Sequence, residues 1–379
     1  MPTAAEKLNL ISRNTEEVLT AQDAERLVMD GKPLRHYIGF EISGRIHLGT
    51  GLQCMAKVRD FQAAGIDCTL FLADWHTWIN DKLGGDWPFI KAVATDYFAE
   101  GLKACLRSLG GDPDSLTLQM GSDLYQQRAD SYWSTVVEIS KHTNLARIQR
   151  SITILGRKEG ESVDFAKLLY PVMQVADIFA LQVNVAHAGL DQRKAHVIAR
   201  EVGKKLRINP LLDSAGNAIP PVAVHHHLIL GLRKPPVWPV PTENRQDLWA
   251  SMKMSKSEPD SAIFIDDSAD DIRRKVNKAF CPPEESEFNP ILDWVRSLVY
   301  GAAGQAMRIA DQQGATTTYG RYDELETAYM TGALHPGDLK RGMADWLIET
   351  LEPARETLGS AELTDIRNRL EAQTTGRRR

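Results

Sequence analysis

Two short motifs, far apart in the chain, carry residue types that suit the binding of phosphate groups. The first reads YIGFEISGRIHLGT over residues 37–50, and the second reads KMSKS over residues 253–257. In the first motif a strand-like run leads into a turn at Ser43 and Gly44, and His47 then opens an apolar helical run. A helix N-terminus offers free N–H groups and the positive end of the helix dipole, so anionic groups bind there. The first motif therefore predicts a nucleotide phosphate site.

Three side chains in these motifs are candidates for catalytic work. His47 can donate a hydrogen bond to a phosphate oxygen, and Gly49 lets a base or ribose approach the backbone closely. The second motif places Lys253 and Lys256 on a serine-bearing loop, where they suit gripping a pyrophosphate as it leaves. We therefore predict that His47, Lys253 and Lys256 stabilise transferring phosphates.

A third stretch, YPVMQVAD over residues 170–177, combines polar groups with an apolar background. Tyr170, Gln174 and Asp177 are spaced i, i+4 and i+7, so they share one helix face. A phenol, an amide and a carboxylate on one face can bind an ammonium group and a phenol together. The alternative is a core helix whose polar residues reach solvent. Gln192 offers another amide beyond the next expected strand.

Composition limits the class of protein without identifying it. The 379 residues are enough for two or three domains, and the net charge of −5 lacks the basic balance typical of nucleic-acid binders. The four cysteines are scattered without CxxC spacing, which favours reduced thiols in a cytosolic protein. The polar N-terminus predicts no signal peptide, and no apolar run reaches the length needed to span a membrane.

Strand-like runs alternate with helical stretches through the first part of the chain. The alternation predicts an α/β fold with a doubly wound parallel, Rossmann-like sheet and a connective insertion, with ligands at the carboxyl ends of its strands. A small all-α C-terminal domain should follow. The expected parts are an N-terminal helical segment, 1–30; the catalytic domain, 31–230; a proline-rich linker with the KMSKS loop, 231–288; and a helical C-terminal domain, 289–379, which the family resemblance described below makes an anticodon-binding domain.

Expected elements can be assigned within these parts. Helices are expected at 4–10 and 16–29, the second with a capped start at 14–17, and strands at 36–40, 68–73, 116–120, 183–187 and 262–266. The run His225-His226-His227 invites a metal hypothesis, but neighbouring side chains of a strand point to opposite faces. We therefore predict no metal site there, and favour a core or nucleotide contact.

The two phosphate motifs resemble the two signatures of class I aminoacyl-tRNA synthetases. The second matches letter for letter, whereas the first departs at Thr50, where the family usually has histidine. From about residue 34 to 358 the chain resembles the tyrosyl-tRNA synthetases of the archaeal and eukaryotic type. The further supporting runs are FLADWH, GSDLYQ, YPVMQVAD, GLDQRK and LHPGDLK.

The resemblance implies roles for particular residues. Tyr37 and Asp177 would contact the substrate phenol, while Tyr170, Gln174 and Gln192 would hold the α-amino group. The ATP-binding residues would be Gly39, Glu41, Gly49, Thr50, Met254, Ser255 and Ser257.

Contacts with tRNA follow from the same resemblance. Those with the acceptor end would come from Arg150, Arg193 and Lys194, and those with the first anticodon base from His335 and Asp338. The aromatic residue expected to stack on that base is not evident, because the aligned region holds Gln312 and Gln313.

The implied activity is that of a tyrosine–tRNA ligase. Tyrosine and ATP, the latter with Mg²⁺, would give tyrosyl-adenylate, and the tyrosyl group would pass to tRNA(Tyr). The resemblance also implies a homodimer in the cytoplasm. Three alternatives remain: a paralogue that adenylates tyrosine or an analogue without charging tRNA, a non-catalytic binding relative, and a tryptophanyl-tRNA synthetase, which shares the fold and the second motif.

Overall fold

The structure is a computed structural model that describes residues 2–243, 245–256 and 258–376. The chain forms two compact units whose segments alternate along the sequence. The first unit comprises Met1–Ser43, Asp60–Thr95 and Asp114–His227, and the second comprises Gly44–Arg59, Asp96–Pro113 and Leu228–Arg379. The helix α3 (Cys54–Ala63) and the π-helical turn η3 (Val93–Phe98) each run from one unit into the other.

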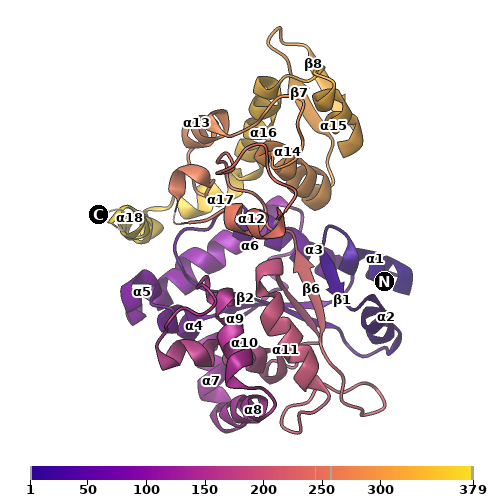
Figure 1. The fold of residues 1–379 in the computed structure, drawn as a ribbon, viewed down its shortest axis with the longest axis vertical. Helices are drawn as coiled ribbons and strands as arrows, with labels where there is room; N and C mark the ends of the chain where they lie inside the picture. Colours follow the sequence, from indigo (N-terminus) through magenta and orange to yellow (C-terminus); the bar gives the residue numbers. More distant parts are fainter. Residues whose placement is uncertain (1, 244, 257, 377–379) are drawn as a thin grey trace. The chain divides into compact units, whose positions relative to one another are not determined.

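The first unit is built on a six-stranded sheet (Figure 1). Its order is β1-β6-β5-β2-β3-β4, and all neighbouring pairs are parallel except β1 and β6. The strands are β1 (Glu17–Leu19), β2 (Arg35–Phe40), β3 (Asp67–Leu72), β4 (Thr117–Met120), β5 (Val185–Gly189) and β6 (Val222–His226). The predicted α/β fold with a mostly parallel sheet is confirmed.

Helices occupy most of the first unit outside the sheet. Their bounds are α1 (Ala4–Ser12), α2 (Ala21–Met29), α4 (Asp74–Ile79), η2 (Lys82–Gly85), α5 (Trp87–Ala92), α7 (Gly121–Gln127), α8 (Ala129–Lys141), α9 (Leu145–Ser151), η4 (Ile152–Leu155), α10 (Phe165–Ala180), η5 (Leu190–Gln192) and α11 (Arg193–Gly203). The buried α10 is central to the core, which also takes side chains from α7, α8, α9 and α11.

The centre of the sheet is where the strand order reverses. β2 has β3 on one side and β5 on the other, and both pairs are parallel. In open parallel sheets, ligands bind beyond the carboxyl ends of the strands at such a switch point. Glu41 directly follows β2, and η5 directly follows β5, so residues from both positions lie at the expected binding edge.

The second unit is mostly helical. Its remaining elements are η1 (Gly49–Gln53), α6 (Ala99–Ser108), α12 (Arg245–Met252), η6 (Pro259–Ser261), α13 (Ala269–Lys278), α14 (Pro290–Trp294), η7 (Val295–Ala303), β7 (Met307–Ala310), β8 (Thr316–Tyr319), α15 (Tyr322–Met330), α16 (Pro336–Thr350), α17 (Glu352–Leu358) and α18 (Ala361–Gly376). The predicted helical C-terminal region is confirmed. The hairpin β7–β8, which lies beside α15 and α16 in Figure 1, corrects the expectation that strands end before residue 289.

Two local expectations were wrong. The helix expected at 16–29 begins only at Ala21, where the side chain of Thr20 caps it, because Glu17–Leu19 instead forms β1 and pairs with β6. The strand expected at 262–266 is reduced to an isolated antiparallel bridge between Phe264 and His47. In both places a partner distant in sequence decides the conformation, and local patterning contains no signal of it.

Within the described residues, no helix is both long and apolar enough to cross a membrane.

Candidate active site

A buried carboxylate, Asp177, forms the polar centre of the first unit. It lies on α10 with 1% of its surface exposed, and its Oδ1 accepts hydrogen bonds from the hydroxyls of Tyr125 and Tyr132, each at 3.0 Å. Burial raises the pKa of Asp177 well above its usual range, while the two tyrosine hydroxyls act in the opposite direction. The site therefore holds a hydrogen-bond acceptor whose charge is costly to leave unpaired.

Tyr37 faces the same region from β2. It is 2% exposed, and its ring packs edge-on against Phe71 with centroids 6.2 Å apart. Burial, together with the nearby charge of Asp177, raises the pKa of the Tyr37 phenol. The two residues predicted to read a substrate phenol thus lie within electrostatic range of each other, although they are far apart in sequence.

A second polar group surrounds Glu41, just beyond β2. The hydroxyl of Tyr170 donates to Oε2 of Glu41 at 3.4 Å, and Nδ2 of Asn80 donates to the same oxygen at 2.7 Å. Lys82 lies on the other carboxylate oxygen, with its Nζ 3.6 Å from Oε1. Asn80 is buried, and its Nδ2 also donates to the carbonyl of Leu155 at 3.2 Å.

The two predicted amides continue this arrangement. Nε2 of Gln174 donates to Oε1 of Gln192 at 3.3 Å, and Nε2 of Gln192 donates to the carbonyl of Ile154 at 3.1 Å. Asn80 and Gln192 thus donate hydrogen bonds to consecutive backbone carbonyls of the turn η4.

The contacts around Glu41 and Gln192 close into a ring. Tyr170 and Gln174 sit one turn apart on α10, and the ring passes through Glu41, Tyr170, Gln174, Gln192, the η4 turn and Asn80. We call this set the acceptor ring. Two buried oxygens in it, Oε1 of Gln174 and Oδ1 of Asn80, accept no hydrogen bond. Unsatisfied buried acceptors are costly, so the ring suits a ligand that brings N–H donors.

His47, the histidine of the first motif, lies in the second unit, and its hydrogen bonds define the tautomer of its ring. Nδ1 of His47 accepts hydrogen bonds from the backbone N–H groups of Gly49 at 3.1 Å and Thr50 at 3.4 Å. The proton of a neutral His47 ring must therefore sit on Nε2, which lies 3.4 Å from the hydroxyl of Thr50. A Cβ on Gly49 would lie 3.0 Å from Cε1 of His47, so glycine is needed there for this close packing.

His47 is held in its neutral form. Burial, and then the positive charges of Lys256 and Lys253, lower the pKa of His47 to about 3. Because their charges act on His47, both predicted lysines of the second motif lie within electrostatic range of the first motif. The described part of that motif is also anchored by its backbone, because the N–H of Met254 donates to the carbonyl of Ile229 at 2.8 Å.

The second motif differs from residue to residue in its surroundings. The Nζ of Lys256 lies 5.0 Å from the ring centre of Phe98, a cation–π contact, while Lys253 and Ser255 are half-buried. The side chain of Met254 is buried, so it is not exposed to a nucleotide. The predicted contact of Ser257 lies outside the described residues.

The predicted ATP-binding residues are divided between the units. Gly39 and Glu41 belong to the first unit, where Gly39 is exposed on β2, and Gly49 and Thr50 belong to the second. The predicted tyrosine-binding residues all belong to the first unit. The predicted catalytic residues all belong to the second.

The residues expected to meet the tRNA acceptor end gather on one side of the first unit. Arg150 is exposed on α9, and its carbonyl accepts a hydrogen bond from Nζ of Lys194 at 2.7 Å. Arg193 is held by the carboxylate of Glu17, with its Nε 2.8 Å from Oε2.

The residues expected to read the anticodon lie at the start of α16, in the second unit. Nδ1 of His335 accepts from the N–H of Gly337 at 3.0 Å, which caps this helix, and Asp338 pairs with Arg341. Gln312 and Gln313 lie in the turn of the β7–β8 hairpin. No aromatic side chain takes part in this turn, 311–315.

The histidine run is absorbed by the core of the first unit. Nδ1 of His226 lies 2.8 Å from Nε2 of His187, and Nε2 of His225 lies 3.0 Å from Nδ1 of His196. Nδ1 of His227 lies 2.6 Å from Glu16. Among the residues described, no group of three His, Cys, Asp or Glu side chains is arranged to hold a metal ion.

Sequence reasoning missed several residues of these sites. Tyr125, Tyr132 and Asn80 contact predicted residues directly, and Lys82 pairs with Glu41. Tyr125 lies in the run GSDLYQ, which supported the family resemblance but was given no role. Tyr132 and Asn80 have no comparable local signal.

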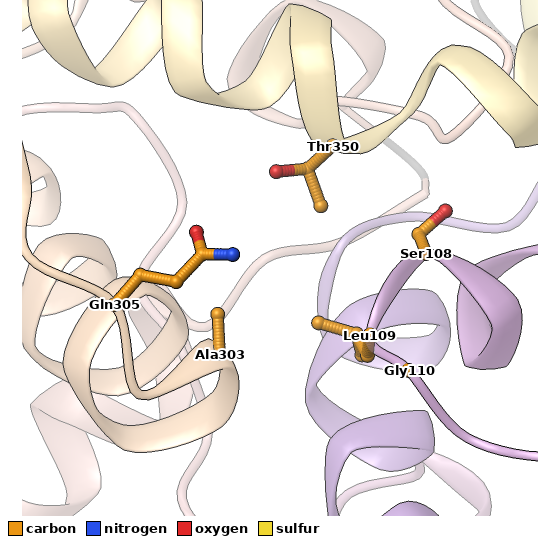
Figure 2. Close-up of a pocket in the computed structure, with 6 residues that line it drawn as sticks. All are labelled: Ser108, Leu109, Gly110, Ala303, Gln305 and Thr350. Atoms are coloured by element: carbon orange, nitrogen blue, oxygen red, sulfur yellow. The ribbon is translucent and has the colours of Figure 1, made fainter.

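A small cavity of about 270 Å³ lies in the second unit, apart from the predicted residues (Figure 2). The side chains of Gln305 and Thr350 project toward it, and the remaining lining comes from Ser108, Leu109, Gly110 and Ala303. None of the six lining residues has an ionisable side chain, so the cavity offers no acid–base chemistry.

Comparison with known protein families gives a match over most of the chain. The model of the family described as tRNA synthetases class I (W and Y) matches residues 29–352. The tyrosine–tRNA ligase of Thermococcus sibiricus is 52% identical over 354 residues, which cover 92% of this chain and 94% of the relative. The tyrosine–tRNA ligase of Pyrococcus abyssi is 51% identical over 355 residues, covering 93% and 94%.

Solved structures agree with the sequence relatives. The crystal structure of tyrosyl-tRNA synthetase from Pyrococcus horikoshii, complexed with L-tyrosine, superposes with a TM-score of 0.93 at 48% identity and covers 98% of this chain and 100% of that one. A tryptophanyl-tRNA synthetase from Aeropyrum pernix K1 superposes with a TM-score of 0.65 at 17% identity, over 92% of this chain and 84% of that one. This second likeness reflects a shared fold.

Proposed function

The chain belongs to the class I tRNA synthetases for tryptophan and tyrosine, and from this premise we propose how its residues carry out the reaction. It is a tyrosine–tRNA ligase, since tyrosine–tRNA ligases share about half of its residues over more than nine-tenths of both chains. The alternative of a tryptophanyl enzyme is thereby excluded. The roles of individual residues, described next, are proposals.

The observation that carries the choice of amino acid is the buried Asp177. Its Oδ1 is already bonded to Tyr125 and Tyr132, and Tyr37 lies within range of its charge. A substrate phenol placed between Tyr37 and Asp177 satisfies both polar groups. Phenylalanine in the same place would leave them unpaired and buried, which is how such a pocket rejects it.

The acceptor ring is the proposed seat of the α-ammonium group. Its unsatisfied oxygens on Gln174 and Asn80 can accept two of the three N–H donors of an ammonium, and Glu41 adds a negative charge. Tyr170 and Gln192 complete the set. In this proposal Glu41 binds the amino acid, whereas the family resemblance implied that it binds ATP.

The second unit supplies the groups proposed to act on phosphate. In the first step a tyrosine carboxylate oxygen attacks the α-phosphorus of ATP, and the bond from that phosphorus to the bridging oxygen breaks, which releases pyrophosphate. Nε2–H of His47 donates to a phosphate oxygen, and Lys253 and Lys256 stabilise the departing charge. In the second step the terminal ribose hydroxyl of tRNA(Tyr) takes the tyrosyl group and AMP leaves.

Mg²⁺ is proposed to enter with ATP. The described residues hold no cluster of ligands that could form a dedicated metal cage, and Mg²⁺ commonly binds through the phosphates of a nucleotide substrate. Its contribution is to neutralise phosphate charge. The residues that bind and orient the nucleotide remain those of the two motifs.

For tRNA, the proposed contacts are electrostatic at one end and specific at the other. Arg150, Arg193 and Lys194 would meet phosphates of the acceptor end. His335 and Asp338, at the N-terminus of α16, would contact the first anticodon base.

A homodimer is proposed because α8 presents apolar side chains to solvent. Trp133 is 37% exposed and Val137 is 59% exposed, four residues apart on this helix, and Leu118 is exposed on the edge strand β4. A surface of this kind suits a second copy of the chain. The cytoplasm is the proposed location, because charged tRNA is consumed there by ribosomes.

The test measures ATP–pyrophosphate exchange with tyrosine, tryptophan and phenylalanine in turn, followed by transfer of labelled tyrosine to tRNA. Exchange with tyrosine alone, and transfer to tRNA, are expected. Exchange without transfer would indicate the paralogue that does not charge tRNA, and absence of exchange would indicate a non-catalytic relative.

A further inference from the structure

A cluster of charged side chains in the second unit has no part in the chemistry proposed so far. Its members alternate in sign and are held by one another: Arg45, Asp266, Asp267, Lys275, Arg367 and Glu371. We call this set the charge cluster. Three of the residues are cations and three are anions, so the cluster is neutral as a whole. It contains an arginine only two residues from His47.

Arg45 is committed to this cluster rather than free for a phosphate. Its guanidinium donates to Oδ1 of Asp266 at 2.7 and 3.1 Å and to Oδ1 of Asp267 at 3.0 Å. The same group lies over the ring of Phe264, with its central carbon 4.4 Å from the ring centre. Burial disfavours the charge of Arg45, but the two aspartates outweigh it and raise its pKa. The Nε and Nη2 groups of Arg45 are thus occupied by the two aspartates.

Backbone hydrogen bonds hold the segment that carries His47 beside residues 263–265. The N–H of Leu48 donates to the carbonyl of Ile263 at 3.1 Å, and the N–H of Ile265 donates to the carbonyl of Ile46 at 2.9 Å. These two bonds flank the bridge between His47 and Phe264. The loop before His47 is therefore hydrogen-bonded through its backbone to the segment 263–267. Arg45 and Asp266 form an ion pair at one end of this pairing.

The helix α18 contacts the same ion pair between Arg45 and Asp266. Nε of Arg367 lies 3.3 Å from Oδ2 of Asp266, an ion pair without a hydrogen bond, at the carboxylate oxygen that Arg45 does not bind. Oε1 of Glu371 lies 3.7 Å from the guanidinium of Arg45. Arg367 and Glu371 are one helical turn apart, so they present opposite charges along one face of α18. Leu370, which is 1% exposed, anchors the helix between them.

We propose that α18 is a brace for adenylate formation, and that Arg367 is a positioning residue: it holds Asp266, Asp266 holds Arg45, and Arg45 fixes the loop that presents His47 to the nucleotide. This inference rests on the proposed role of His47. The consequence is that Arg367, which lies outside both signature motifs, affects the position of His47 and therefore the efficiency with which the enzyme uses ATP. The tyrosine pocket lies in the other unit and is not part of the brace.

The experiment compares three variants of the full-length protein in ATP–pyrophosphate exchange. Arg367→Gln removes the charge that faces Asp266, Arg367→Lys keeps the charge, and Arg369→Gln removes a charge from an exposed position of the same helix. Exchange is measured over ranges of ATP and of tyrosine, so that kcat and both KM values are separated, and the unfolding temperature of each variant is recorded.

Arg367→Gln is expected to lower kcat/KM for ATP by roughly fivefold or more, because small misplacements of a phosphate-binding group are costly. Its KM for tyrosine should stay unchanged. Arg367→Lys should recover at least part of the loss, and Arg369→Gln should behave as the unaltered enzyme.

Equal ATP kinetics in Arg367→Gln and Arg369→Gln would overturn the proposal. So would a loss in Arg367→Gln that affects ATP and tyrosine alike and follows a lowered unfolding temperature, since that pattern marks a general structural defect. Failure of the unaltered protein to catalyse exchange would instead refute the proposed function, so the two failures are distinguishable.

Discussion

The hydroxyl of Thr50 lies 3.4 Å from Nε2 of His47, the ring nitrogen that carries the proton. The other ring nitrogen is occupied, because Nδ1 accepts from the backbone N–H groups of Gly49 and Thr50. Before a nucleotide binds, the Thr50 hydroxyl is therefore a local acceptor for the proton that we propose His47 gives to a phosphate. The departure from the usual motif thus touches the catalytic histidine directly.

Replacing Thr50 tests this relationship. Thr50→Val keeps the shape but removes the acceptor, so adenylate formation should persist with at most a small change in rate. Thr50→His should raise the rate or leave it unchanged if the loop has room for the imidazole. A fall of tenfold or more in Thr50→His, which is about 1.4 kcal/mol of barrier, would show in pre-steady-state measurements that the loop is adapted to threonine.

Acid should destabilise the fold through its buried neutral histidines. Burial lowers the pKa of His76 from the ordinary histidine value of 6.5 to about 3. Between these values the unfolded chain binds a proton that the folded chain does not, so stability is present above pH 6.5 and is lost as pH falls toward 3.

A matched pair of variants isolates this effect. Denaturant unfolding across pH 4–7 should show a shallower loss of stability in His76→Gln than in the unaltered protein, by up to about 1.4 kcal/mol per pH unit. His142→Gln, at an exposed position, is the control variant. An unchanged slope in His76→Gln would contradict the assignment.

Much of the first-unit site could be predicted from sequence because its residues share one helix face. The spacing of Tyr170, Gln174 and Asp177 predicts one shared helix face, and α10 does contain all three residues. The parallel sheet followed from alternation of strand-like and helical runs. Neither prediction needed knowledge of distant contacts.

The remainder depends on contacts that local patterning does not encode. Asn80 bonds to Leu155, 75 positions away, and β1 exists because Glu17 pairs with His225. Arg45 sits inside a phosphate motif, yet Asp266 and Asp267 engage it. The short hairpin β7–β8 was missed because its four-residue strands give too short a pattern to distinguish from a loop.

The lysines of the second motif should affect rate more than substrate affinity. Lys253→Ala and Lys256→Ala are expected to slow adenylate formation with little change in the dissociation constant of tyrosine, because the lysine charges act on the transferring phosphates. Lys278→Ala, an exposed lysine on α13, is the control. A normal rate of adenylate formation with a raised dissociation constant of tyrosine would place these lysines in the amino-acid site instead.

Glu41 should matter only for ligands with an ammonium group. Glu41→Gln is expected to weaken binding of tyrosine while leaving 3-(4-hydroxyphenyl)propionate, which lacks the amino group, unchanged. In the acceptor ring Glu41 contacts Tyr170 and Asn80, neither of which is among the residues proposed to contact the substrate phenol. Calorimetry with both ligands measures the difference. Equal weakening for the two ligands would show that Glu41 acts through general structure.

The final prediction concerns the reading of the phenol. Tyr37→Phe and Asp177→Ala are expected to reduce the preference for tyrosine over phenylalanine far more than they disturb the fold, with about 1–3 kcal/mol lost per buried polar contact. Asp177→Ala also strands the hydroxyls of Tyr125 and Tyr132, so its unfolding free energy should fall more than that of Tyr37→Phe.

Tyr132→Phe separates stability from selectivity. It removes one donor to Asp177 from a ring that packs against Tyr125 in the core, so it should cost stability while keeping the preference for tyrosine. Exchange rates with tyrosine and phenylalanine, beside denaturant unfolding, give both quantities for every variant. If Tyr37→Phe and Asp177→Ala keep the full preference for tyrosine, the substrate phenol must be read elsewhere. If Tyr132→Phe loses that preference as well, the selecting contact extends from Asp177 into the α8 side of the core.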